Sequence, residues 1–137
     1  MNNNRTNTRV LVKQDYKTYN ELESVIQEMD NFVDAIVVEG IHDKEALEKL
    51  GITKEIVLCS SRPHTDFVDY ISSRHKKVVI LTDYDRTGKR INKKLSSWLE
   101  RAGIKVEKRY RDEVGKILGF RGMRSIESVN ALKKRII

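Results

Sequence analysis

VVILTDYDRTGKRI, residues 78–91, passes from four apolar residues almost directly into two aspartates, Asp83 and Asp85, and then into a basic stretch. A short apolar run bounded by turn-forming residues is typical of a strand buried within a parallel sheet. Residues two apart in an extended segment point to the same side, so both carboxylates can reach one point in space. This stretch therefore predicts a buried strand that ends at a pair of carboxylates.

Similar apolar runs recur along the chain, and stretches with helical spacing separate them. We expect four strands, over residues 35–40, 55–60, 77–83 and 104–110. The intervening segments repeat apolar residues every three or four positions, which is typical of helices with one buried face. These helices are expected over residues 42–50, 66–74 and 88–102. Alternating strands and helices of this length predict an α/β fold with a mainly parallel four-stranded sheet.

The two ends of the chain are expected to surround this core. Residues 1–9 are polar and rich in Asn, which predicts a flexible tail, and VLVK at residues 10–13 suggests a short edge strand. Apolar residues at helical spacing predict a helix over residues 20–34 that covers one face of the sheet. Residues 111–137 are expected to form two short helices, with a break around residues 119–122.

The length and composition predict one soluble domain. A chain of 137 residues can bury a core without disulfides, and the lone Cys59 lies in an apolar run, as a buried residue would. We expect a single domain over residues 10–137, with its catalytic core at about 34–110. The longest apolar runs have four residues, and the N-terminus lacks the apolar core of a signal peptide. We therefore expect a cytoplasmic protein without a membrane partner.

The net charge of +7 is unevenly distributed. Residues 1–100 hold equal numbers of basic and acidic residues, so the whole excess lies in residues 101–137 and makes the C-terminal helical segment (111–137) basic. A second basic concentration, over residues 74–94, surrounds Asp83 and Asp85. Such charges often form only a solvated surface. A basic field around fixed carboxylates nevertheless suits a polyanion whose phosphates need both cations and a metal.

Three carboxylates are expected at one edge of the sheet. Right-handed crossovers place the C-terminal ends of parallel strands on the same edge, where α/β folds bind ligands. Glu39 ends the first strand, and Asp83 and Asp85 end the third, so the three converge if those strands are neighbours. Carboxylates without a thiolate or imidazole favour one or two Mg²⁺ or Mn²⁺ ions over zinc. The alternative is that the two aspartates only cap the following helix.

VVEGIHDKEAL, residues 37–47, together with ILTDYDRTGKRI, residues 80–91, resembles the Toprim domain. That domain occurs in bacterial primases, in type IA and type II topoisomerases, and in the ribonuclease that trims the 5S ribosomal RNA precursor. The resemblance covers most of the chain and is nearest to small stand-alone Toprim proteins of archaea and bacteria. RDEVGKILGFRGMRSIESV, residues 111–129, is similar to the C-terminal part of the archaeal group.

This resemblance implies a three-layer, Rossmann-like Toprim fold and a set of site residues. Glu39 of the EG motif and the aspartates of the DxD motif, Asp83 and Asp85, would bind Mg²⁺ or Mn²⁺ and carry the catalytic chemistry. Glu39 could instead act as a general acid or base. Asp43 also matches the family, but a position near the start of a helix explains it equally well as an N-cap.

One departure from the family affects the expected surface. Topoisomerases continue the DxD motif with Arg-Glu-Gly-Glu, whereas this chain reads Arg86-Thr87-Gly88-Lys89 and lacks both acidic residues. The change favours a basic lip that faces phosphates over a topoisomerase-like second metal. We expect the nucleic-acid footprint to consist of Arg86, Lys89, Arg90, Arg111, Lys116, Arg121 and Arg124.

The leading hypothesis is Mg²⁺-dependent phosphodiester chemistry on nucleic acid, with nuclease-like cleavage or processing of RNA or DNA. An alternative is a non-catalytic, metal-dependent nucleic-acid-binding module of a larger complex. We expect nucleic acid as the partner, and a homodimer or a larger nucleic-acid-processing complex as the alternatives for assembly. A remote alternative is a phosphatase of the haloacid-dehalogenase type, because Asp83, Asp85 and Thr87 fit its DxDxT spacing. The sequence does not distinguish RNA from DNA as the substrate.

Overall fold

The computed structural model of the chain describes the backbone of residues 3–136 and the side chains of residues 9, 10 and 12–136. Four parallel strands form one sheet in the order β2-β1-β3-β4. The strands are β1 (Ala35–Val38), β2 (Glu55–Leu58), β3 (Lys77–Ile80) and β4 (Lys105–Glu107). All four predicted strands and their parallel arrangement are confirmed, although each is shorter than expected. In the centre of the sheet, Ala35 of β1 lies opposite both Glu55 and Val78.

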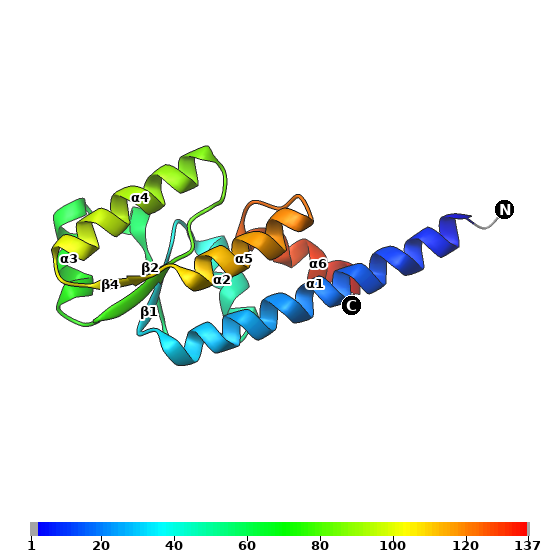
Figure 1. Ribbon diagram of the computed structural model, residues 1–137, viewed down its shortest axis with the longest axis horizontal. Coiled ribbons are helices and arrows are strands. Elements are labelled where there is room, and N and C mark those ends of the chain that lie inside the picture. Colours follow the sequence, from blue (N-terminus) through cyan, green and yellow to red (C-terminus); the bar gives the residue numbers. More distant parts are fainter. Residues whose placement is uncertain (1–2, 137) are drawn as a thin grey trace.

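Helices cover both faces of this sheet and give the molecule three layers (Figure 1). The three crossover helices are α2 (Ile41–Lys49), α3 (His64–Ser72) and α4 (Arg86–Arg101), and a short 3₁₀ turn, η1 (Cys59–Ser61), precedes α3. The remaining elements are α1 (Asn3–Phe32), α5 (Arg109–Phe120), a second 3₁₀ turn, η2 (Ile126–Ser128), and α6 (Val129–Ile136). The two predicted C-terminal helices are present, and their break lies slightly later than expected.

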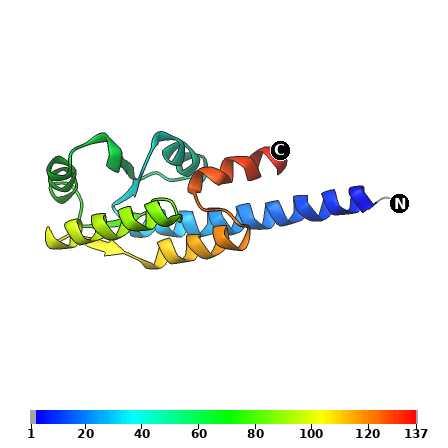
Figure 2. The same cartoon turned by 90° about the horizontal axis from the view of Figure 1, so that it is seen from above.

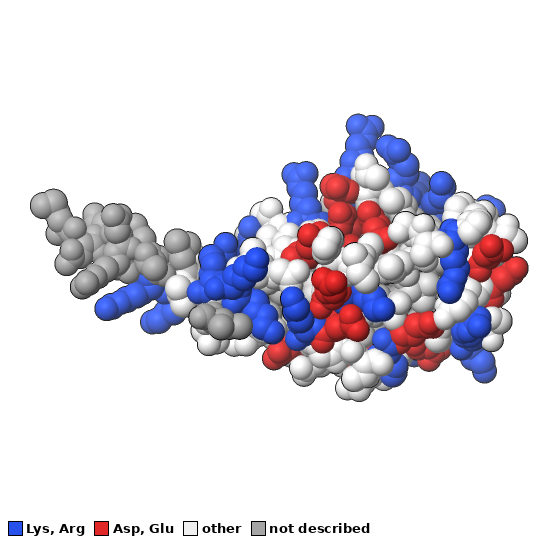
Figure 3. Space-filling view, turned by 180° about the vertical axis from the view of Figure 1, so that it is seen from behind, with Lys and Arg blue, Asp and Glu red and all other residues white. Residues whose placement is uncertain are grey.

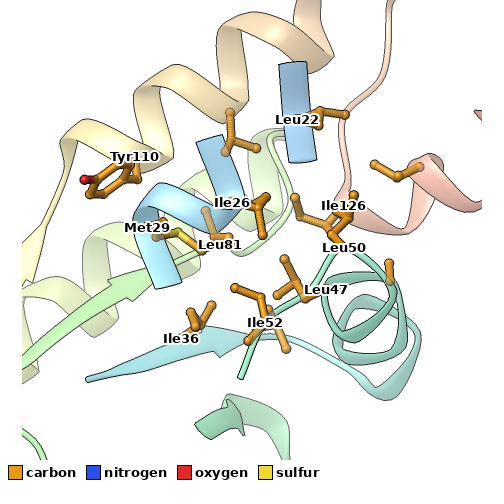
Figure 4. Packing of buried hydrophobic residues seen from close by; sticks show 14 of the residues in the cluster. Leu22, Ile26, Met29, Ile36, Leu47, Leu50, Ile52, Leu81, Tyr110 and Ile126 are labelled. Carbon is orange, nitrogen blue, oxygen red and sulfur yellow. The ribbon is translucent and has the colours of Figure 1, made fainter. Parts of the chain in front are cut away.

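Alternation along the central strand divides the core into two halves. Ile36 and Val38 of β1 pack on one face with residues of α1, α2, α5 and α6, and Figure 4 shows part of this cluster around Leu22 and Ile26. Ala35 and Val37 pack on the other face with residues of α3 and α4. Because both faces are covered, all four residues of β1 are buried, as expected for the middle of a parallel sheet.

The N-terminal region differs from the sequence prediction. Helix α1 begins at Asn3 instead of Asn20, so the edge strand predicted at residues 10–13 is wrong. Residues 3–9 of the expected tail form the first turns of the same helix, and residues 1–2 lie outside the described residues. The pattern was misleading because the buried face of this part of α1 is polar, with Asp15 and Thr18 both buried.

Helix α1 extends well beyond the sheet, and α5 and α6 lie along it (Figure 2). The C-terminal segment therefore rests on the N-terminal helix, far from it in sequence. Across the described residues, no helix combines the length and the apolar composition that crossing a membrane requires.

Candidate metal centre

The EG motif and the DxD motif meet at the C-terminal edge of the sheet. Strands β1 and β3 are neighbours, and the amide of Leu81 extends their ladder by donating to the carbonyl of Val37 at 2.8 Å. Two residues further on, the backbone amide of Asp83 donates a hydrogen bond to Oε1 of Glu39 at 3.1 Å. The strand order thus places Glu39 directly beside the DxD loop, which we define as residues 82–85.

Asp83 lies in an environment of negative charge. Burial raises the pKa of its carboxyl to about 6, and the neighbouring charges of Glu39, Asp43 and Asp85 act in the same direction. Glu127 of η2 contributes more weakly to the same rise in pKa. A partly buried carboxylate surrounded by like charges is unfavourable unless it is protonated or a cation is bound.

Asp85 has a structural role that the sequence left open. Its Oδ1 accepts a hydrogen bond from the amide of Gly88 at 2.7 Å, which makes it the N-cap of α4. The capping alternative therefore holds for Asp85, while Asp83 bonds through its backbone to Glu39. The second carboxylate oxygen of Asp85 is not used in the cap.

Gly88 brings the first turn of α4 against the DxD loop. A Cβ at this position would lie 2.0 Å from the carbonyl oxygen of Asp83, so no other residue fits without moving the backbone. The hydroxyl of Thr82 also donates to the carbonyl of Gly88 at 2.8 Å. Loop and helix are therefore held as one unit, and the positions of Asp83 and Asp85 depend on this contact.

The three carboxylates fit a divalent cation by chemistry, but they do not form a completed ligand set. Among residues 3–136, no group of three or more His, Cys, Asp and Glu side chains is arranged to hold a metal ion. Glu39 and Asp85 each accept a hydrogen bond from a backbone amide, and the convergence of Glu39, Asp83 and Asp85 on one bound ion stays a prediction. Hard oxygen donors with mutual repulsion remain the set that Mg²⁺ or Mn²⁺ prefers.

Asp43 connects the site to the C-terminal segment. It is the third residue of α2, whose N-cap is Gly40 without any side-chain cap, so the predicted N-cap role is wrong. The buried carboxylate accepts hydrogen bonds from the amide of Gly40, at the start of the same helix, and from the amide of Glu127 at 3.3 Å, and burial raises its pKa. Sequence reasoning missed Glu127, because no spacing relates η2 to the EG and DxD motifs.

The prediction that Arg111 contacts nucleic acid is wrong, because its side chain is buried. Its guanidinium donates to the carbonyl oxygens of Ile80, Thr82 and Asp83 at 3.1, 2.8 and 3.2 Å. It also lies over the ring of Tyr84, 4.4 Å from the ring centroid. The donors of Arg111 therefore hold the DxD loop in place and face away from any external phosphate.

The prediction that Arg121 contacts nucleic acid is also wrong, because its side chain is bound to α1. Its guanidinium donates to Oδ1 of Asp15 at 2.5 Å and to the hydroxyl of Thr18 at 2.8 Å, and only 16% of its side chain is exposed. Arg121 therefore forms an ion pair with the buried Asp15 of α1. A single sequence gives no signal for this pair, because its members lie more than a hundred residues apart.

The other five cations of the predicted footprint are exposed and remain available to a ligand: Arg86, Lys89, Arg90, Lys116 and Arg124. Lys89, Lys116 and Arg124 line a common cavity of about 590 Å³ beside Tyr84. Viewed from the side opposite to Figure 1, basic side chains project along the upper edge of the molecule, with acidic side chains directly below them (Figure 3).

Comparisons with known proteins cover the region of the chain that holds both motifs. The family model described as the Toprim domain matches residues 34–116, which include both motifs. A UPF0292 protein of Pyrococcus horikoshii is 36% identical over 120 residues, covering 88% of this chain and 89% of that protein. A UPF0292 protein of Methanocaldococcus jannaschii is 37% identical over 95 residues, covering 69% and 73%.

A solved structure of an Aquifex aeolicus protein shows the same fold. It matches with a TM-score of 0.66 and 32% identity, over 77% of this chain and 94% of that one. The family match, the relative that aligns over most of both chains and the shared fold lead to one conclusion: the chain belongs to the Toprim domain family, among the small UPF0292 proteins.

Proposed function

We propose that this protein carries out Mg²⁺- or Mn²⁺-dependent phosphodiester chemistry on nucleic acid, in the form of nuclease-like cleavage or processing of RNA or DNA. Membership of the Toprim family associates the chain with metal-dependent, nucleic-acid-related function. The observation that carries the proposal is the contact between Glu39 and the DxD loop, where Asp83 is surrounded by carboxylates. Exposed cations, which suit phosphates, border the same edge of the sheet.

The residues of the chain divide into three tasks in this proposal. Asp83, Asp85 and Glu39 would hold one or two divalent cations, which supply charge stabilisation to the oxygens of a scissile phosphate. Glu39 accepts from the amide of Asp83 and is close enough to the loop to serve alternatively as a general acid or base. Arg111 fixes the loop, and Arg86 and Lys89 would contact phosphates on either side.

One observation favours a second candidate function, a non-catalytic nucleic-acid-binding module. This module would still depend on metal, and the exposed cations Lys89, Lys116 and Arg124, which lie together beside the DxD loop, would bind phosphates without any reaction taking place. The haloacid-dehalogenase alternative loses its support, because the Toprim match accounts for Asp83, Asp85 and Thr87 together with the EG motif.

The test is incubation with labelled structured RNA, single-stranded DNA and duplex DNA, in Mg²⁺, in Mn²⁺ and in chelator. The key variant is Asp83→Asn, which keeps the shape of the side chain and removes its charge, and the matched control is Asp69→Asn on the exposed surface of α3. Products that need metal and disappear only in Asp83→Asn support the proposed chemistry. Metal-dependent retention of nucleic acid without products supports the binding module, and release of phosphate from small monoesters contradicts both.

A further inference from the structure

The cavity beside Tyr84 adjoins the candidate metal centre and is built largely by the C-terminal segment. It has a volume of about 590 Å³, within the range of about 300–1,000 Å³ that is usual for small-molecule sites. Its lining comes from the DxD loop, the first turns of α4, helix α5 and the turn that follows α5. Lys89, which the proposed chemistry assigns to a phosphate, is one of its lining residues.

Tyr84 fixes the cavity next to the carboxylates. Its amide donates to the carbonyl of Arg124 at 2.6 Å, and its hydroxyl donates to the carbonyl of Arg111 at 2.7 Å. Gly115 permits this approach, since a Cβ there would lie 2.7 Å from the tyrosine ring. Tyr84 separates Asp83 from Asp85, so a ligand in the cavity lies one residue away from the candidate metal ligands.

The charges of the cavity suit phosphates. Lys89, Lys116 and Arg124 are exposed, and within the part of the chain that the structure describes none of them takes part in a salt bridge. Asp112 is the one carboxylate in the lining, so cations predominate. Clefts lined mainly by one sign of charge concentrate ligands of the opposite sign.

An exposed aromatic ring lies next to this cavity in the sequence. Phe120 ends α5 directly after Gly119, which is a lining residue, and Phe120 is 92% exposed. The other large apolar residues that project into solvent from the described chain are exposed to 50% or less. Proteins that bind single strands combine a cationic groove with aromatic rings on which bases stack. Phe120 shares α5 with Lys116, and Arg124 lies in the turn that follows this helix.

We propose that the cavity and Phe120 bind an unpaired nucleotide, so that the substrate class of this site is single-stranded nucleic acid. Lys89, Lys116 and Arg124 bind the phosphates of the strand, and a base stacks on the ring of Phe120. This inference rests on the proposed function, because a strand bound in this way would place its neighbouring phosphate near the candidate metal ligands. A duplex does not fit as well, because its base faces are already stacked and reach a protein ring only after flipping.

The test measures binding by fluorescence anisotropy in chelator, so that it does not depend on cleavage. The probes are a labelled single-stranded DNA, an RNA of the same sequence, and the duplex of that DNA. We expect Phe120→Ala to weaken binding of the single strands by roughly 5- to 150-fold, the effect of losing one stacked base. Duplex binding should stay within twofold. Tyr16→Ala removes a half-exposed aromatic ring from α1 and serves as the matched control.

Phe120→Trp gives a direct readout of stacking. It should restore single-strand affinity, and its tryptophan fluorescence should be quenched by the bound base. The wild-type protein, whose lone tryptophan is Trp98, supplies the baseline signal. The competing explanation is that Phe120 packs against a second copy of the chain and does not contact nucleic acid. In that case, sedimentation shows a wild-type dimer that becomes monomeric in Phe120→Ala, and this outcome overturns the proposal.

The outcomes separate this inference from the proposed function. Equal single-strand affinity of the wild-type protein and Phe120→Ala overturns the inference alone, whether or not cleavage occurs. Phe120-dependent binding without any metal-dependent product supports the inference and contradicts the proposed chemistry. Failure of the wild-type protein to bind any of the three probes in chelator overturns the inference alone, because the proposed chemistry is tested separately by cleavage in the presence of metal.

Discussion

Asp83 is the residue on which the site depends most, and its ionisation has a measurable effect on folding. Its pKa of about 6 lies above the value of about 3.9 that is expected in an unfolded chain. Protonation therefore stabilises the folded state. The stabilisation is full below about pH 4 and is lost as the pH rises through about 6.

Asp83→Asn should consequently raise the free energy of unfolding at pH 7, in chelator, by about 1 kcal/mol, a value reduced for the partial exposure of the side chain. At pH 4 the same change should have little effect, because the wild-type carboxyl is protonated in the folded state. Denaturant unfolding at both pH values measures the difference. A gain of equal size at pH 4 would contradict an electrostatic origin, and Asp69→Asn should change neither value.

Arg111 shows how tertiary contacts reassign a residue that reads as a surface charge. It lies in a basic segment, yet its guanidinium satisfies carbonyl oxygens of Ile80, Thr82 and Asp83 in the interior. Charge patterning cannot detect this role, since the partners are backbone atoms 28 to 31 residues away. The proximity of Glu39 to the DxD loop was easier to predict, because Glu39 and the loop each follow one of two neighbouring strands.

Arg111→Ala should destabilise the fold by about 2–4 kcal/mol, because it leaves buried carbonyl oxygens without donors. Lys116→Ala, an exposed neighbour on the same helix, should change the free energy of unfolding by about 0.5 kcal/mol or less. Thermal and denaturant unfolding measure both variants. Equal effects of the two substitutions would show that Arg111 is not the anchor of the DxD loop.

Among the elements, α4 joins the site most directly to the sheet. The run of apolar residues in β3 and the helical spacing of α4 could both be predicted from the sequence, and so could the parallel arrangement of the strands. The close contact between Gly88 and the carbonyl of Asp83 could not, because glycine in a first helical turn has many possible causes. The sequence also did not predict the full length of α1. The buried face of its N-terminal part consists of polar residues that bond to the C-terminal segment, so it shows no apolar stripe.

Gly88→Ala should separate the start of α4 from the DxD loop, because the added methyl group meets backbone that has no flexible side chain to displace. We expect a loss of more than about 2 kcal/mol in the free energy of unfolding and a loss of metal-dependent stabilisation. Gly119→Ala is the matched control, since its Cβ meets nothing within 4 Å, and it should gain up to about 1 kcal/mol from helix propensity. The measurement is unfolding with and without Mg²⁺. A Gly88→Ala protein as stable as Gly119→Ala would contradict the proposed contact.

On the scale of the whole molecule, the N-terminal helix and the C-terminal segment form one support for the site. Asp15 of α1 accepts from Arg121 at 2.5 Å and from Nε of Arg135 at 2.7 Å, which connects α1 to the ends of α5 and α6. The C-terminal segment in turn supplies Glu127 beside Asp43 and much of the cavity beside Tyr84. The sequence predicted the sheet and its motifs but not this support, because its contacts join residues far apart along the chain.

Asp15→Asn tests whether this support is a single unit. Hydrogen bonding to Arg135 and Arg121 lowers the pKa of Asp15 despite its burial, so the wild-type pair contributes stability at neutral pH that is lost as the pH falls below about 4. The substitution leaves two arginines facing a neutral amide and should lower the free energy of unfolding by about 2 kcal/mol or more at pH 7.

Hydrogen exchange should show the loss of protection concentrated in α6 and the adjoining part of α1. Strands β1 and β3 should keep their protection, because their contacts lie in the other parts of the core. Arg135→Gln, which removes the more exposed partner, should give the same pattern with a smaller effect. Uniform loss of protection across the sheet would mean that the pair stabilises the whole fold and is not a local attachment of the C-terminal segment.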